Sequence, residues 1–525
     1  MNKLKFIFTL SIDQSTKIMI VLIQLVYSLV YNSTGKLIRF CRNYILSSIF
    51  FFSLFFGFQL FAKSKIVFQA DTSKKCHYQS LLSKPNVFTG VLDSLKKIDK
   101  LNRKNRSLKE VKLAYESILE QQKGFINSRM FLFDTLIYPF ANSILENIKA
   151  ANSKYDLFNH VVISRSRIPN AYCYGNGVIV INLGILSFLK NEDQLAALIG
   201  HEYAHHVMQH MEKGIEYKKA HYQDKETKKK LRKINRTEIA QNANYEQFEL
   251  ENAMVYRAQN RALERQADSL GFELLKKTDY SKKAALDLLR LLDSCDLEKY
   301  NYKLDYSQIF SNGEYEFNSK LLLDKAGMEL EEKQDQSIID ALKTHPDCKE
   351  RIENINNLFN SNEEKPSPSE RDISSIGKIS DYEMLFSDIE NKRFALCIKN
   401  ALLFQKEEKD KILEVLIANC LAELYFAQKN HLLWNYIPHP SDDYIYNYHQ
   451  LLVIIENIRL SELKKLTLAY IEKVNSDIGQ NTMDCGGYVE YLKLQQKSII
   501  ENSHPSEEQK EIIKLDYPNN SFLVN

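Results

Sequence analysis

Over most of the chain, apolar residues recur every three or four positions, which is the spacing of amphipathic helices. The spacing is clear in residues 87–151 and again in residues 381–429 and 443–473. Two short runs of β-branched residues, 161–164 and 178–181, interrupt it and indicate strands. The pattern predicts a mainly helical α+β fold with one small sheet and an all-helical C-terminal part.

The segment between the two predicted strands is rich in residues that favour turns. It contains Pro169, Asn170, Gly175 and Gly177. We therefore expect the two strands to be consecutive partners in a hairpin.

The candidate chemistry lies in the next helix, which Asn191 and Gln194 are expected to cap. This helix contains the pattern His201-Glu202-x-x-His205. Two histidines four positions apart lie about 40° apart around a helix, so both imidazoles point the same way. Their separation suits one small tetrahedral metal ion, most often zinc. Glu202 lies at the rim of the same face, where it can act on a water molecule at the metal.

An open zinc site needs a third protein ligand, because only the fourth position is left for water. Residues 261–275 predict another helix, on which Glu264 and Asp268 share a face. A carboxylate in the position of Glu264 can ligate zinc, and Asp268 can accept a hydrogen bond from a ligating histidine. Spacing alone does not separate this pair from a pair of surface acids. Three other acids are equally eligible as the ligand: Glu249, Glu251 and Glu273.

Several motifs, taken in their order, resemble those of the gluzincin metallopeptidases. This family includes the CAAX prenyl endopeptidases, the HtpX-type stress proteases and the BepA-like proteases. The motifs are Pro-Asn-Ala at 169–171 with its glycine turn, residues 191–196, His-Glu-x-x-His, Glu-x-x-Ala-Asp-x-x-Gly at 264–271, and Thr-His-Pro-x-x-x-x-Arg-Ile at 344–352. The resemblance covers roughly residues 155–358. It implies a zincin-type metallopeptidase domain that binds one Zn2+ ion per chain and hydrolyses peptide bonds.

By this resemblance, zinc is held by His201, His205 and Glu264, and Asp268 orients one of the ligands. Glu202 is the catalytic general base. The multi-spanning members of the family have membrane helices around the motif, and this sequence has no long apolar segment there. The likeness is therefore greatest to the soluble, exported BepA-like branch, and prenylated substrates are not expected.

Three more histidines lie in or near the motifs. His345 is in a Thr-His-Pro turn that can aim its imidazole into the cleft as a second catalytic group. There it can stabilise an oxyanion or fill the fourth metal position in a resting state, and a loop histidine with local hydrogen bonds is the equal alternative. If the first helix continues, His206 and His210 point away from the metal, so we expect them to have packing or surface roles.

The strand that contains Val178, Ile179 and Val180 is expected to border the cleft and to bind substrate. An exposed strand edge can add an extended peptide as a further strand, with little preference for its sequence. Completing the sheet is the alternative role of this strand.

An uncharged run of 19 residues, 44–62, follows Arg39 and Arg42. Its length and its basic flank are those of a signal peptide or an N-terminal membrane anchor. We therefore expect an exported protein, in the periplasm or the cell envelope, that associates with a membrane if this segment is retained.

The expected organisation follows from these features. The ranges are a signal peptide or anchor (1–64), a helical lead-in (65–154), the metallopeptidase domain (155–360), a proline-containing linker (361–372) and a helical, repeat-like domain (373–525). A formal net charge of +3 in 525 residues gives no reason to expect a nucleic-acid partner. The eight cysteines form no Cys-x-x-Cys pair, so a cysteine zinc knuckle is not expected either.

The sequence thus predicts a zinc-dependent endopeptidase that acts on exported or membrane-associated proteins in envelope quality control. The helical C-terminal domain can hold a protein partner or simply cap the protease. The alternative is a latent, chaperone-like adaptor that binds client proteins without cutting them.

Overall fold

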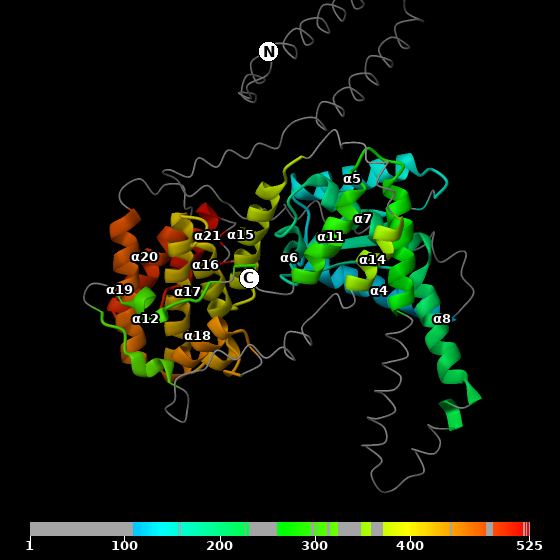
Figure 1. The fold of residues 1–525 in the computed structure, drawn as a ribbon. Helices are drawn as coiled ribbons and strands as arrows, with labels where there is room; N and C mark the ends of the chain where they lie inside the picture. The colour runs from blue at the N-terminus through cyan, green and yellow to red at the C-terminus, as the bar shows by residue number, and fades with distance from the viewer. Residues whose placement is uncertain are drawn as a thin grey trace, which may run out of the picture. The chain divides into compact units, whose positions relative to one another are not determined.

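A small four-stranded sheet forms from residues 131–182 of the computed structural model (Figure 1). The structure describes residues 109–229, 260–323, 348–358, 371–478 and 487–523, apart from positions 156, 158, 226, 296–298, 301, 312–314, 442–443, 518–519 and 521. The strands are β1 (Phe131–Leu132), β2 (His160–Ser164), β3 (Ala171–Cys173) and β4 (Val178–Asn182). Their order across the sheet is β1-β2-β4-β3.

The pairing of β4 differs from the predicted hairpin. β4 runs parallel to β2, with Val162 opposite Val180, and antiparallel to β3, with Tyr172 opposite the same residue. The expected hairpin between residues 161–164 and 178–181 is therefore wrong. The chain first forms β3, and the hairpin joins β3 to β4 through a turn in which Gly177 has a φ of 88°. Residues with a side chain rarely adopt this conformation, so the turn requires glycine.

The prediction that Val178, Ile179 and Val180 form an exposed edge that binds substrate is also wrong. β4 has a hydrogen-bonded neighbour on each side, so it is not an edge, and all three side chains are fully buried beneath the helices that cover the sheet. The sheet edge on this side is β3. The sequence pattern missed β3 because it is only three residues long and lies between turn-forming residues.

Helices cover both faces of the sheet. On one face, Val180 packs in a core cluster with Ile126 of α4 (Lys109–Asn127). Since side chains alternate along a strand, Ile179 points to the opposite face. On that face α7 (Glu192–Val207) packs across β3 and β4.

The N-terminus of α7 is capped as predicted, with the side chain of Asn191 accepting a hydrogen bond of 2.9 Å from the backbone N–H of Gln194. The flanks of α7 are formed by α5 (Ile137–Ala151) and α11 (Lys283–Ser294). A further helix, α14 (Cys348–Leu358), packs on α11. Most of α7 is thereby buried, which explains why the residues before its first histidine are apolar rather than amphipathic.

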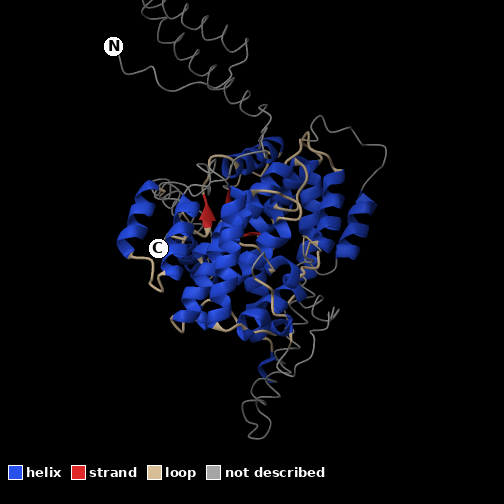
Figure 2. Ribbon diagram, turned by 90° about the vertical axis from the view of Figure 1, so that its left-hand side faces the viewer, coloured by secondary structure: helices blue, strands red, loops and turns tan. Residues whose placement is uncertain are grey.

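The remaining elements are helical, and the strands are confined to one part of the described chain (Figure 2). Near the sheet lie α6 (Leu183–Leu186) and α8 (His210–Gln223). The helix α12 (Tyr306–Phe310) and the 3-10 helix η1 (Ser319–Leu322) pack instead against the C-terminal helices. The C-terminal helices are α15 (Ser374–Glu390), α16 (Phe394–Phe404), α17 (Lys411–Lys429), η3 (Leu433–Asn435), α18 (Tyr446–Asn457), α19 (Leu460–Ile478), α20 (Gly487–Ile500) and α21 (Glu507–Asp516). The predicted α+β fold class, with an all-helical C-terminal part, is confirmed.

The helical part is joined to the sheet by buried ion pairs. Arg165, just after β2, lies 3.1 Å from Glu383 and 2.5 Å from Glu390, both on α15. Arg167 makes a 2.5 Å ion pair with Asp388 of the same helix. These pairs fix α15 against the segment that leads into β3.

Two predicted segments lie wholly or mostly outside the described residues. Residues 44–62 lie outside them, and no described helix is both long and apolar enough to span a bilayer. Most of the predicted linker also lies outside them, but its last residues, Arg371 and Asp372, pair with Glu192 and Asn191 at the start of α7.

Replacing Arg165 by alanine is expected to lower the free energy of unfolding by about 3–5 kcal/mol, because two buried carboxylates lose their cation. The side chains of Arg165 and Glu383 are 2% and 0% exposed, so water cannot solvate the carboxylates once the guanidinium group is removed. Urea unfolding measures the change. The matched control, Arg290→Ala, removes an exposed pair with Asp287 and should cost less than about 1 kcal/mol. Equal effects of the two substitutions would contradict a buried contact at Arg165.

Candidate metal centre

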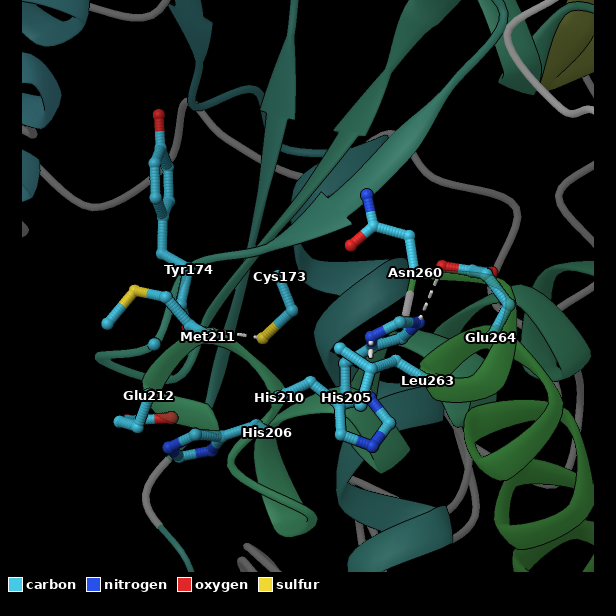
Figure 3. A pocket seen from close by; sticks show the side chains of 11 residues that line it. Cys173, Tyr174, His205, His206, His210, Met211, Glu212, Asn260, Leu263 and Glu264 are labelled. Carbon is cyan, nitrogen blue, oxygen red and sulfur yellow. Dashed lines mark hydrogen bonds and ion pairs between the residues drawn. The ribbon is translucent and has the colours of Figure 1, made fainter. Parts of the chain in front are cut away.

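Three potential metal ligands converge from two helices. His201 and His205 project from α7, and Glu264 projects from the helical segment 260–275. Figure 3 shows His205 and Glu264. The Nε2 atoms of the two histidines are 3.1 Å apart. The Glu264 carboxylate oxygens lie 3.4 Å from Nε2 of His201 and 3.5 Å from Nε2 of His205.

These separations fit a single zinc ion. Ligand atoms about 2.0–2.1 Å from a tetrahedral zinc ion are about 3.3 Å from one another. The three observed distances scatter closely around that value. Two imidazoles and one carboxylate are also a donor set that zinc accepts with a fourth position left open.

A close contact between two helices brings Glu264 to the histidines. A Cβ atom on Gly271 would lie only 3.1 Å from the Cα of His201, so glycine permits this approach. Glu273, which spacing left eligible as a ligand, instead has a half-exposed side chain that pairs with Lys276. Glu249 and Glu251 lie outside the described residues.

A second layer of charged groups holds His201. Its Nδ1 lies 3.0 Å from Asp268, as the sequence predicted for an orienting carboxylate. Arg351 donates two hydrogen bonds of 2.7 and 2.8 Å to Asp268 and lies 3.3 Å from Glu264. The Arg351 side chain is buried and anchors α14 to this cluster.

The charges of this cluster favour a cation between the ligands. Burial alone would lower the pKa of His201, but Asp268 and Glu264 raise it to about 10. Burial and the neighbouring His201 lower the pKa of His205 to about 3. The pKa of Glu264 is held below its usual range by His201, against the effect of burial. The carboxylates therefore stabilise one positive charge at the point where the ligand atoms converge.

Glu202 is the buried acid beside the first ligand. Burial raises its pKa to about 7, while the charge of His201 opposes the rise. A carboxyl group with a pKa near 7 both accepts and releases a proton readily at neutral pH.

A cavity of about 300 Å3 opens beside the ligands (Figure 3). Its walls come from the end of β3 and the turn after it, from the junction of α7 and α8, and from the helical segment 260–275. The lining residues are Cys173, Tyr174, Gly175, His205, His206, His210, Met211, Glu212, Asn260, Leu263 and Glu264. The cavity thus links the metal ligands to the edge strand.

The other predicted histidines have different outcomes. His206 is buried and its Nδ1 lies 3.1 Å from Asn159, which confirms a packing role. His210 is buried and is not one of the three converging ligand atoms, as expected, but its assumed place on a continuous helix is wrong, because α7 ends before it and its Nδ1 lies 3.0 Å from Nδ1 of His205. His345 lies outside the described residues, so its suggested catalytic role stays a prediction.

Comparison with known proteins agrees with this site. Residues 140–358 match the model of Peptidase family M48, and this part of the chain is therefore an M48 metallopeptidase domain. The match contains both histidines, Glu202, Glu264 and Asp268. The resemblance to gluzincin metallopeptidases is confirmed.

Two curated relatives carry the name mitochondrial metalloendopeptidase OMA1. The chain is 33% identical to the one from Schizosaccharomyces pombe over 81 residues, which are 15% of this chain and 24% of the relative. It is 38% identical to the one from Arabidopsis thaliana over 55 residues, which are 10% of this chain and 11% of the relative. The chain therefore matches only a minor part of each relative's length.

A buried hydrogen-bond chain supports one wall of the cavity. The Tyr115 hydroxyl lies 2.6 Å from the carbonyl oxygen of Gly175 and 2.5 Å from a carboxyl oxygen of Glu212. A hydroxyl has one proton, and a carbonyl oxygen can only accept, so Tyr115 donates to Gly175. The short contact with Glu212 then requires a protonated carboxyl group as donor. Burial raises the pKa of Glu212 to about 7, in agreement with this arrangement.

This arrangement predicts how stability changes with pH. Because the pKa of Glu212 rises from 4.5 to about 7 on folding, the native state binds more protons than the unfolded state between these values, and stability falls as pH rises through this window. Glu212→Gln keeps a donor but cannot ionise. Below pH 4.5 the variant should match the wild type, and above pH 7 it should be more stable by about 2–3 kcal/mol. Urea unfolding at several pH values checks this, and a difference that does not change with pH would contradict the assignment.

Proposed function

We propose that this chain is a zinc-dependent endopeptidase in which His201, His205 and Glu264 hold the metal. The observation that carries the proposal is the set of three ligand atoms found among the described residues, which lie within 4.8 Å of one another inside an M48 domain. Structural zinc sites are usually closed by four protein ligands, so the three that the described residues supply favour catalysis.

The residues around the ligands have distinct roles in peptide hydrolysis. Zinc, when bound, polarises the scissile carbonyl group and acidifies a water molecule. Glu202 accepts the proton of the attacking water and passes it to the nitrogen of the leaving amine. Asp268 and Arg351 keep His201 in the tautomer whose Nε2 faces the metal.

The edge strand β3 is the best place for the substrate backbone. Within the described part of the chain it pairs only with β4, and its end lines the cavity beside His205 and Glu264. An extended peptide that adds to β3 as a further strand would lead past the ligands. This binding mode uses the backbone and therefore suits unfolded protein segments of varied sequence.

The cavity sets a charge preference for one substrate side chain. Its described lining residues include no lysine or arginine, and the charged or readily charged groups among them are acids and histidines. An aspartate or glutamate entering it would meet Glu264, and also Glu212 once that group ionises above pH 7, and the described lining offers no lysine or arginine to pair with it, which is costly in a partly buried site. Apolar and basic side chains do not meet this repulsion.

The proposed setting is the cell envelope, with the protein exported and held near a membrane by its N-terminal segment. The support is the uncharged run 44–62 after two arginines. In this setting the enzyme would remove misfolded exported or membrane-associated proteins, and the helical C-terminal domain would hold a protein partner. Cell fractionation of the full chain tests the location.

Two substitutions separate metal binding from proton transfer. Glu202→Gln should retain about one zinc per chain but reduce cleavage of a denatured protein such as casein by at least about a thousandfold, because the general base is lost. His205→Ala should lose both zinc and activity. Zinc analysis and a cleavage assay with and without a chelator measure both effects.

The matched control for loss of a metal ligand compares two acids on the same helical segment. Glu264→Gln should lower zinc content, whereas Glu273→Gln, on the exposed side, should leave zinc and cleavage unchanged. Normal turnover by Glu202→Gln would overturn the proposed mechanism. Zinc binding without any cleavage by the wild type would instead favour the adaptor role.

Cleavage of a peptide library derived from a whole proteome tests the proposed charge preference of the cavity. We expect aspartate and glutamate to be depleted at one position next to the cut by about tenfold, the effect of roughly 1.4 kcal/mol. Leu263→Arg places a cation in the cavity wall and should relieve the depletion at that position. A wild-type enzyme that accepts acidic side chains equally at every position would contradict this role of the cavity.

A further inference from the structure

The two histidine ligands are supported by different partners. Nδ1 of His201 faces the carboxylate of Asp268, which Arg351 holds. Nδ1 of His205 faces Nδ1 of His210 at 3.0 Å, and the two rings meet edge to face with centroids 4.9 Å apart. His210 is buried, with 5% of its surface exposed. The contact is drawn as a dashed line in Figure 3.

The tautomers of this pair follow from the ligand geometry. The Nε2 atom of His205 faces Nε2 of His201 and the Glu264 carboxylate, so it is the atom available to a metal. A neutral imidazole that offers Nε2 as a ligand carries its proton on Nδ1. The Nδ1–H group of His205 therefore donates, and Nδ1 of His210 accepts.

An unusual backbone turn places His210 at this point. α7 ends at Val207, and Gln209 has φ 55° and ψ 44°, in the left-handed region that residues with side chains rarely adopt. The chain reverses there, so His210 starts α8 instead of continuing around α7. A continuous helix would carry His210 about 180° away from His201. The turn brings it back to His205.

We propose that His210 is a positioning residue that accepts the Nδ1–H hydrogen bond of His205 and so directs Nε2 of His205 to the metal. The inference rests on the proposed zinc site and deepens it. The outer partner of a ligating histidine fixes its tautomer and ring orientation, and loss of such a partner typically weakens metal binding by 10–100-fold. His210 thus does for His205 what Asp268 does for His201, but with a neutral acceptor.

The experiment compares acceptors of different chemistry at position 210 by zinc affinity, measured by competition with a chelator. His210→Leu has no acceptor and should bind zinc about 10–100-fold more weakly than the wild type. His210→Asn places an amide oxygen on Cγ, where the imidazole has Nδ1, and should restore affinity to within about threefold. Thermal unfolding of the metal-free variants verifies that each is folded.

His206→Leu is the matched control, because it removes the adjacent buried histidine, whose Nδ1 contacts Asn159. Its zinc affinity should equal that of the wild type. Three results would overturn the proposal: wild-type affinity in His210→Leu, no recovery in His210→Asn, or an equal loss in His206→Leu. Each of them means that position 210 does not act through an acceptor.

If His210→Leu does not fold, His210→Asp takes its place. An ionised acceptor should bind zinc at least as tightly as His210→Asn, and weaker binding overturns the proposal. Zinc binding by the wild-type chain distinguishes a failure of this inference from a failure of the proposed function. A wild-type chain that binds no zinc contradicts the metal site itself, whereas normal wild-type binding with an unaltered His210→Leu variant contradicts only the role of His210.

Discussion

The site depends on one close helix–helix contact. At Gly200 and Gly271 the helical segment 260–275 approaches α7 so closely that a Cβ atom on Gly271 would press on the backbone of His201. This approach is what lets Glu264 reach both imidazoles and Asp268 reach the far nitrogen of His201. A larger residue at Gly271 would separate the two helices and pull the carboxylates away from the ligands, whereas a Cβ atom on Gly200 would meet its nearest neighbours at an ordinary 3.7 Å. The two acids and the glycine of the Glu-x-x-Ala-Asp-x-x-Gly motif therefore act together, since the glycine sets the distance at which the acids work.

Charge balance is the second constraint on this contact. Several acids converge in a buried place, and each needs a cation or a proton. Arg351 pairs with Asp268 in bidentate geometry. The proton on His201 balances the negative charge of Glu264, which a bound metal ion would otherwise balance. Glu202 and Glu212 respond differently, with pKa values raised to about 7 by burial. Near neutral pH one buried environment thus contains ionised acids that hold ligands and acids that carry or transfer a proton.

The sequence predicted the parts of the site that depend on local spacing. The helical histidine pair and the Asn191 cap follow from positions a few residues apart, and both are present as expected. Glu264 could not be separated from Glu273 by spacing, and the choice came from the resemblance to a family. The strand order could not be predicted, because β3 is too short to show a pattern and its insertion places β4 inside the sheet. His210 was misplaced because nothing in the sequence, such as a glycine at position 209, indicates that the helix stops. The errors therefore concern long-range pairing and a strained turn.

In the proposed site, two imidazoles and one carboxylate hold zinc and leave a position open. X-ray absorption at the zinc edge of the full, zinc-loaded chain tests it most directly. We expect only nitrogen and oxygen neighbours at about 2.0–2.2 Å, with scattering from two imidazoles, and we expect His205→Ala to lose this signal together with the metal. A sulfur neighbour at about 2.3 Å, or an unchanged spectrum in His205→Ala, would contradict it.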